Sequence, residues 1–139
     1  MVIGGVEIEH ERRLSGHSDA DVLTHAVIDA LLGACGLGDL GELFPDDEEQ
    51  WREADSIDML RVVVGRLPGA VANVDATVIC EKPRLAPYKL EMASRLTGVL
   101  SAPVSVKAST NEGMGAIGRG EGIACVAVAL VDTGDELPR

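Results

Sequence analysis

The sequence predicts one domain in which helices pack on one face of a β-sheet. A chain of 139 residues with 46% hydrophobic residues is long enough to bury a core within one domain. Three segments have the apolar spacing of amphipathic helices, and two others, 72–81 and 103–108, have the pattern of strands. The segment 122–131 is apolar on both faces, so we expect a central strand with helices on one side and, as one option, another subunit on the other.

The N-terminal third predicts a hairpin followed by a helix. Gly4–Gly5 lie between two short apolar runs, which is typical of a tight hairpin. Ser18 and Asp21 have the spacing of a capping box, so we expect a helix from Asp19 that ends near Gly36. The apolar stripe of this helix is formed by Val22, Leu23, Ala26, Val27, Ala30 and Leu31.

The remaining elements follow in order. Asp55 opens a second helix that Pro68–Gly69 ends, and residues 72–81 then alternate in polarity as a half-buried strand does. Pro87 suits the first turn of a third helix, with core positions at Leu90, Ala93, Leu96 and Leu100. Strands at 103–108 and 122–131 complete the domain, which we place at residues 1–131, with a polar tail at 132–139.

One helix face and one strand end carry candidate chemistry. Asp21, His25 and Asp29 follow each other at i, i+4 and i+8, which suits either a metal or phosphate site or an ordinary polar helix face. The cluster at 109–112 ends a strand with hydroxyl and carboxylate groups that suit phosphate and a divalent cation, although a polar turn explains it equally well. Lys82 and Arg84 form a basic turn that suits phosphate or nucleotide contacts, although exposed basic residues need no such role.

Charge and cysteine content exclude some partners. A net charge of −11 argues against nucleic acid and against an anionic membrane surface. Cys35, Cys80 and Cys125 are far apart and lie in apolar segments, which indicates free thiols in a reducing compartment. With no signal peptide before Val2 and no transmembrane run, we expect a cytoplasmic protein. Residues 113–118 match GxGxxG, but a strand-like run follows them, so we do not assign dinucleotide binding.

Five stretches together resemble the 2-C-methyl-D-erythritol 2,4-cyclodiphosphate synthase family. They are HSDADVLTH, ALLGACGLGDLGELFPD, NVDATVI, KPRLAPY and KASTNEGMGAIGRGEGIA, and the similarity extends from Val2 to Val131. The resemblance implies an α+β fold with a mixed sheet, helices on one face, and the other face at the interface of a homotrimer with an active site at each subunit boundary. The implied reaction converts 4-diphosphocytidyl-2-C-methyl-D-erythritol 2-phosphate to the cyclic diphosphate and releases CMP.

The resemblance also implies roles for individual residues. His17 and Thr110 match residues that stabilise the transition state, His25 matches a zinc ligand, and Glu112 would hold a Mg or Mn ion that bridges the diphosphate. The cytidine part would lie at the turn 80–86, the methylerythritol at 39–48, and the diphosphate at 109–112. The implied substrate-binding residues are Ser18, Asp39, Leu40, Gly41, Phe44, Pro45, Asp46, Asp47, Glu48, Cys80, Pro83, Arg84, Leu85, Ala86, Ser109, Asn111 and Arg119.

The sequence departs from the family pattern at the zinc site. The family takes two further zinc ligands from an Asp-x-His in an N-terminal strand, whereas residues 1–16 contain no Asp and only His10 as a His. One interpretation is a normal zinc synthase of which this chain is a truncated version. The alternative is a zinc-deficient, non-catalytic trimer that binds a cytidine nucleotide or an isoprenoid ligand. We favour the enzyme, because the other site residues of the family are present.

Overall fold

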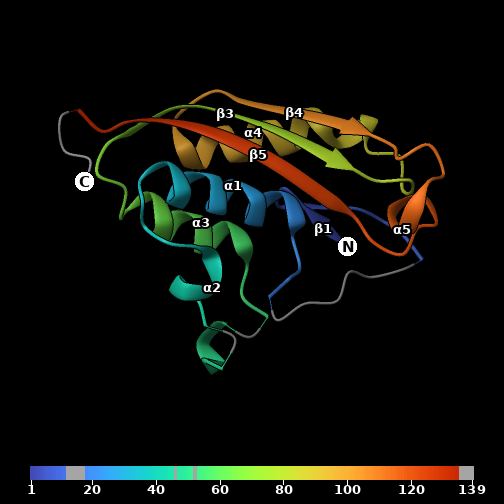
Figure 1. Cartoon of the computed structure of the whole chain (residues 1–139), viewed down its shortest axis with the longest axis horizontal. Helices are drawn as coiled ribbons and strands as arrows, with labels where there is room; N and C mark the ends of the chain where they lie inside the picture. Colours follow the sequence, from blue (N-terminus) through green and yellow to red (C-terminus); the bar gives the residue numbers. More distant parts are fainter. Residues whose placement is uncertain (12–17, 46, 52, 135–139) are drawn as a thin grey trace.

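A three-stranded mixed sheet in the order β4-β3-β5 organises the fold (Figure 1). The central strand β3 (Ala70–Ile79) runs parallel to β4 (Val104–Ser109) and antiparallel to β5 (Ala124–Asp132). The computed structural model describes residues 1–11, 18–45, 47–51 and 53–134. Among these residues, no helix combines the length and the apolar character that crossing a membrane requires.

Helices lie on one face of this sheet, as the sequence predicts. α1 (Val22–Ala34) and α4 (Lys89–Leu100) pack directly on the strands, and α3 (Ser56–Val64) packs against these two helices; Figure 1 shows all three on the same side of the strands. Val74, Ala76 and Val78 of β3 point toward them and are buried. The α+β class and the mixed sheet with helices on one face are therefore confirmed.

Shorter elements connect these parts. The hairpin β1 (Val2–Ile3) and β2 (Val6–Glu7) precedes α1, and α2 (Leu40–Leu43) and the 3₁₀ helix η1 (Glu49–Trp51) follow it. The 3₁₀ helix η2 (Ala86–Tyr88) leads into α4 and has Pro87 in its first positions, so Pro87 lies just before α4 and not, as predicted, in its first turn. A single turn, α5 (Gly115–Gly118), lies between β4 and β5.

The predicted capping box is wrong, because α1 begins later than Ser18 allows. Its N-cap is Asp21, whose side chain accepts a hydrogen bond from the Thr24 N–H at 3.0 Å. Ala20 has φ +56°, a left-handed conformation that a helix interior does not contain, so Ala20 separates Ser18 from the helix. The predicted hairpin and the helix end near Gly36 are confirmed.

Two expectations about burial are also wrong. The last strand, β5, is an edge strand of the described sheet, and β3 is the central one. Leu90 is 86% exposed, because α4 buries Met92, Leu96 and Leu100, and a residue two positions before Met92 lies about 200° around the helix. The predicted core positions Leu96 and Leu100 are confirmed.

The three cysteines are free thiols, as predicted. Cys35 and Cys80 are buried and Cys125 is partly buried. Burial raises the pKa of all three, and for Cys125 burial together with the nearby Asp21 charge raises the pKa to about 11. All three thiols are therefore protonated at neutral pH.

Candidate active site

The loops that follow β3 and β4 lie side by side. The two strands are parallel, and their pairing continues to the Cys80 N–H, which donates to the Ser109 carbonyl at 2.9 Å. Beyond it, Glu81 Oε1 accepts the Asn111 N–H at 2.7 Å and the Gly113 N–H at 3.3 Å. The basic turn and the hydroxyl–carboxylate cluster, 30 residues apart in sequence, therefore form one surface.

Within the cluster, Thr110 and Glu112 contact each other. The Thr110 hydroxyl donates to Glu112 Oε1 at 3.3 Å, and the Glu112 N–H returns a hydrogen bond to Thr110 Oγ1 at the same distance. Ser109, Thr110 and Glu112 are exposed. Two hydroxyls and one carboxylate are thus presented to solvent at the end of β4, which is a chemically suitable set for phosphate oxygens and a divalent cation.

Two apolar side chains of the turn 80–86 are buried in the core. Cys80 is 5% exposed and Leu85 is 4% exposed. The Cys80 thiol donates to the Lys82 carbonyl at 3.1 Å, and the Lys82–Pro83 peptide bond is cis. Lys82 and Arg84 are both exposed. The turn therefore combines buried apolar side chains with a basic outer surface.

Arg119 lies close to this turn, on the segment that follows α5. It pairs with Glu121, with a distance of 2.6 Å from Nε to Oε1. Arg119 and its neighbours Gly118 and Gly120 also line a cavity of about 440 Å³, together with Glu81, Lys82 and one further segment, His10 and Glu11. This cavity places Arg119 next to the end of β3.

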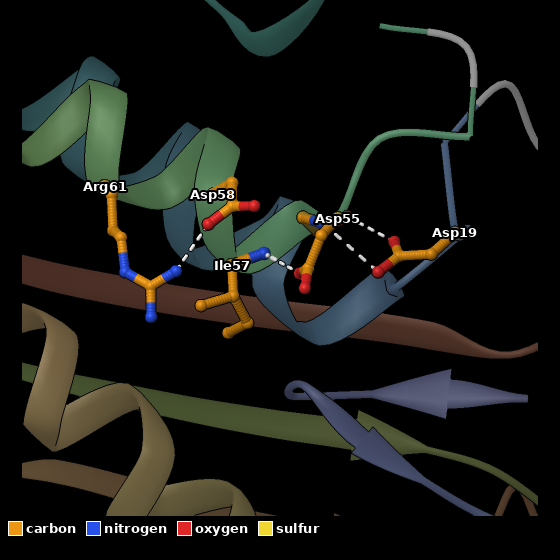
Figure 2. Close-up of polar contacts among 6 residues, drawn as sticks. Asp19, Asp55, Ile57, Asp58 and Arg61 are labelled. Atoms are coloured by element: carbon orange, nitrogen blue, oxygen red, sulfur yellow. Dashed lines mark hydrogen bonds and ion pairs between the residues drawn. The ribbon is translucent and has the colours of Figure 1, made fainter.

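His25 contacts hydroxyls rather than carboxylates. Its Nε2 lies 2.8 Å from Ser56 Oγ and 3.1 Å from Ser18 Oγ. Asp19 accepts hydrogen bonds from the Ser56 hydroxyl and, at 3.1 Å, from the Ser56 N–H. Figure 2 shows Asp19 beside the first turn of α3, where Asp55 accepts the Ile57 N–H at 2.8 Å. The start of α3 is therefore tied to the segment that precedes α1.

The predicted His–carboxylate face does not form a metal site by itself. The Asp21 carboxylate binds the β1–β2 turn, and Asp29 Oδ1 accepts the Leu40 N–H at 2.8 Å. Among the described residues, no group of three His, Cys, Asp or Glu side chains is placed to hold a metal. A zinc site with three protein ligands therefore does not fit the described residues around His25. A magnesium-type ion does fit Glu112, because such ions bind through one or two carboxylates plus substrate phosphates.

The segment 39–48 has its own supporting contacts. Asp39 caps α2 by accepting the Glu42 N–H at 2.8 Å, which places Leu40 and Gly41 in the first turn. Phe44 is 3% exposed and meets Trp51 edge-to-face, with ring centroids 4.7 Å apart. The Trp51 indole N–H donates to Glu48 at 3.1 Å. Phe44 is thus mainly a packing residue, whereas Asp47 is exposed.

The predicted site residues fall into separate groups on one chain. Figure 1 shows α2, at the bottom, well away from α5 and the ends of β3 and β4 at the right. A single chain therefore does not bring the segment 39–48 to the cluster 109–112. Two predicted residues, His17 and Asp46, lie outside the described residues.

Three residues with defined contacts in this region were not predicted: Asp19, Ser56 and Glu81. Asp19 and Ser56 are 37 positions apart and Glu81 lies 30 positions before Asn111, so no local spacing indicates either contact. The only sequence signal for Glu81 is its position at the end of a predicted strand.

Comparisons with known proteins identify the family. The YgbB family matches residues 1–132. The 2-C-methyl-D-erythritol 2,4-cyclodiphosphate synthase of Salinibacter ruber is 51% identical over 139 residues, covering 96% of this chain and 88% of that protein. The Rubrobacter xylanophilus synthase is 53% identical over 137 residues, covering 95% and 83%.

Solved structures agree with this result. The bifunctional IspDF of Campylobacter jejuni matches with a TM-score of 0.87 and 38% identity, over 93% of this chain and 37% of that one. The CDP complex of Plasmodium falciparum IspF matches with a TM-score of 0.79 and 30% identity, over 94% and 83%. The chain therefore belongs to the YgbB family of 2-C-methyl-D-erythritol 2,4-cyclodiphosphate synthases.

Proposed function

We propose that this chain carries out the reaction of its family at the surface formed by the loops after β3 and β4. The reaction is the cyclisation of 4-diphosphocytidyl-2-C-methyl-D-erythritol 2-phosphate to 2-C-methyl-D-erythritol 2,4-cyclodiphosphate, with release of CMP. The main support is the identity of 51% to a named synthase over nearly the whole chain, together with the contact of the two loops. A non-catalytic binding protein is not favoured by these comparisons.

The chemistry is an intramolecular phosphoryl transfer. An oxygen of the 2-phosphate forms a bond to the β-phosphorus, and the bond from that phosphorus to the bridging oxygen breaks, so that CMP leaves with this oxygen. Such a reaction depends mainly on positioning and on neutralising charge. The Thr110 hydroxyl would donate to an oxygen whose charge increases in the transition state. His17 is proposed for the same role, together with Ser18 at the 2-phosphate.

The family is metal-dependent. Of the two proposed ion sites, the structure supports the one at Glu112 better than the one at His25. A Mg or Mn ion on Glu112 would neutralise the diphosphate, and the exposed Glu112 carboxylate beside Thr110 suits such an ion. Zinc binding at His25 is implied by the resemblance alone, and we assign no reaction step to this ion. The turn 80–86 would bind the cytidine part, largely through its backbone. The Plasmodium relative is itself described as a CDP complex.

A direct assay tests the proposed function. Incubation of the chain with 4-diphosphocytidyl-2-C-methyl-D-erythritol 2-phosphate, Zn²⁺ and Mg²⁺ is expected to release one CMP per cyclic diphosphate formed, measured by chromatography and ³¹P NMR. EDTA should abolish the release, and Mn²⁺ should support it in place of Mg²⁺. CDP binding without any CMP release under these conditions would favour the non-catalytic alternative.

We also propose a homotrimer, with the uncovered face of the sheet toward the other subunits. This face exposes Val126, Val128 and Leu130 of β5 at 62%, 67% and 62%. It also carries the ion pair between Lys107 and Asp75, at 2.6 Å, and the hydrogen bond from Lys107 lowers the pKa of Asp75. An apolar strip with polar groups beside it is typical of subunit interfaces. A trimer would also allow the segment 39–48 of one subunit to meet the cluster 109–112 of another.

Replacing Val128 with Lys is therefore expected to dissociate the trimer into monomers. The lysine would place a charge in each apolar interface, and burying an unpaired charge is costly. Sedimentation equilibrium measures the result. Val62→Lys is the matched control, because Val62 is an exposed valine on α3, away from this face, and should leave the trimer intact. A monomeric wild-type chain, or a trimeric Val128→Lys variant, would contradict the proposed interface.

We also propose a cellular compartment, the absence of certain partners and a domain boundary. The free thiols and the acidic net charge of −11 support a cytoplasmic protein without nucleic-acid or membrane partners. β5 ends at Asp132, one residue beyond the end of the domain that we propose at residues 1–131.

A further inference from the structure

We infer that Glu81 is a positioning residue, whose carboxylate fixes the loop that carries Thr110 and Glu112. The inference deepens the proposed function, because it assigns a purpose to a side chain that has none in the proposed substrate contacts. Glu81 Oε1 accepts the N–H groups of Asn111 and Gly113, at 2.7 and 3.3 Å. These are the residues on either side of Glu112, so one oxygen fixes the backbone before and after the proposed cation ligand.

The loop needs such a contact because its backbone is unfavourable by itself. Glu112 has φ +52° and Gly113 has φ +73°. A left-handed conformation is unfavourable at a residue other than glycine, such as Glu112, and persists only where surrounding contacts impose it. Within the loop, the contacts of Thr110 with Glu112 are both 3.3 Å long, so they are weaker than the 2.7 Å bond from Asn111 to Glu81.

Residues 111–114 are also closed by hydrogen bonds of their own. The Asn111 side-chain amide donates to the Met114 carbonyl at 2.8 Å, and the Met114 N–H donates to the Asn111 carbonyl at 2.9 Å. These bonds tie residues 111–114 into one unit. Glu81 connects that unit to the end of β3, where the Cys80 N–H is already bonded to the Ser109 carbonyl.

This arrangement also determines which groups a diphosphate meets. The N–H groups of Asn111 and Gly113 are directed to Glu81, and that of Glu112 is directed to Thr110. The exposed polar side chains at residues 109–114 are those of Ser109, Thr110 and Glu112. Glu81 therefore acts indirectly, by keeping these three side chains in one arrangement before the ligand arrives.

The test uses the full chain with two substitutions of similar size. Glu81→Met removes the acceptor, and Glu81→Gln keeps one carbonyl oxygen, which suffices because both hydrogen bonds reach the same Oε1. Amide hydrogen exchange, followed by NMR, is expected to accelerate about tenfold at Asn111 and Gly113 in Glu81→Met, and to stay close to wild type in Glu81→Gln. Binding of CDP with Mn²⁺, measured by calorimetry, is expected to weaken about tenfold in Glu81→Met and to be restored in Glu81→Gln.

Glu91→Met is the matched control, because Glu91 is an exposed glutamate of α4 whose carboxylate pairs with Arg95 and not with the loop. It should change neither exchange nor CDP affinity. Unchanged exchange in Glu81→Met would overturn the inference, as would a Glu81→Gln variant that behaves like Glu81→Met. Faster exchange with unchanged CDP affinity would overturn the link to ligand binding. A wild-type chain that does not bind CDP would instead refute the proposed nucleotide site, and the exchange data would still decide the role of Glu81.

Discussion

Replacing Asp21 with Ala is expected to lower the free energy of unfolding by about 3–5 kcal/mol. Asp21 is fully buried, and its carboxylate accepts four hydrogen bonds. Its Oδ1 binds the N–H groups of Gly4 and Thr24, at 2.7 and 3.0 Å. Its Oδ2 binds the Gly5 N–H and the Thr24 hydroxyl, each at 2.7 Å. The substitution leaves these donors without an acceptor and also removes the N-cap of α1.

The loss should extend beyond the helix end, because Asp21 joins the hairpin to the core. Gly4 and Gly5 have φ +60° and +69°, and a Cβ at Gly4 would lie 2.8 Å from Leu23 Cδ2. The turn therefore packs directly on α1, and only glycine fits there. Without the carboxylate, the hairpin should detach together with the first turn of the helix.

Urea denaturation measures the loss in the free energy of unfolding. Two further variants test whether this loss comes from the Asp21 carboxylate. Asp21→Asn keeps the size, but its NH₂ group would face two donors, so we expect a loss of about 2 kcal/mol. Asp29→Ala removes a carboxylate from the same helix that accepts one exposed N–H, from Leu40, and should cost less than about 1 kcal/mol. Equal losses for Asp21→Ala and Asp29→Ala would contradict the role assigned to Asp21.

The sequence predicts those features that depend on neighbouring residues. The Gly4–Gly5 hairpin, the N-cap at Asp55 and the strands at 72–81 and 103–108 each follow from local spacing, and the structure confirms them. The predicted capping box was wrong because the spacing allows Asp21 two roles equally well. Asp21 could be the third residue after an N-cap at Ser18, or it could be the N-cap itself. The prediction that Leu90 is buried was wrong, because hydrophobic residues alone do not determine which face of α4 packs on the core. In the structure the buried Met92 lies on that face.

For the candidate site, local sequence patterns predict even less. The cluster 109–112 and the basic turn are recognisable separately, because each is a short run of residues with suitable chemistry. Their contact depends on the parallel pairing of β3 with β4, which no local pattern reveals. The spacing of Asp21, His25 and Asp29 suggested a shared face, yet each side chain binds a different segment. Helical spacing brings side chains near each other but does not determine their partners.

Replacing Thr110 with Val is expected to reduce turnover by about 10²–10³-fold, the largest effect on activity that we predict. Valine matches threonine in shape but has no hydroxyl. The change removes the proposed donor to the transferring phosphoryl group and the acceptor of the Glu112 N–H. Thr110→Ser keeps the hydroxyl and should lose much less activity. Because Thr110 is exposed, neither variant should shift the thermal midpoint by more than about 2 °C.

The effect should appear in kcat more than in KM, because a donor that acts on charge developed in the transition state adds little to substrate binding. Thr133→Val is the matched control, since Thr133 follows β5 and belongs to none of the proposed contacts. A Thr110→Val variant with turnover within about threefold of wild type would exclude the hydroxyl from catalysis. A large rise in KM at unchanged kcat would instead assign Thr110 to ground-state binding of the diphosphate. Only a loss in kcat that serine restores supports a transition-state role, because the hydroxyl is the one group that serine and threonine share and valine lacks.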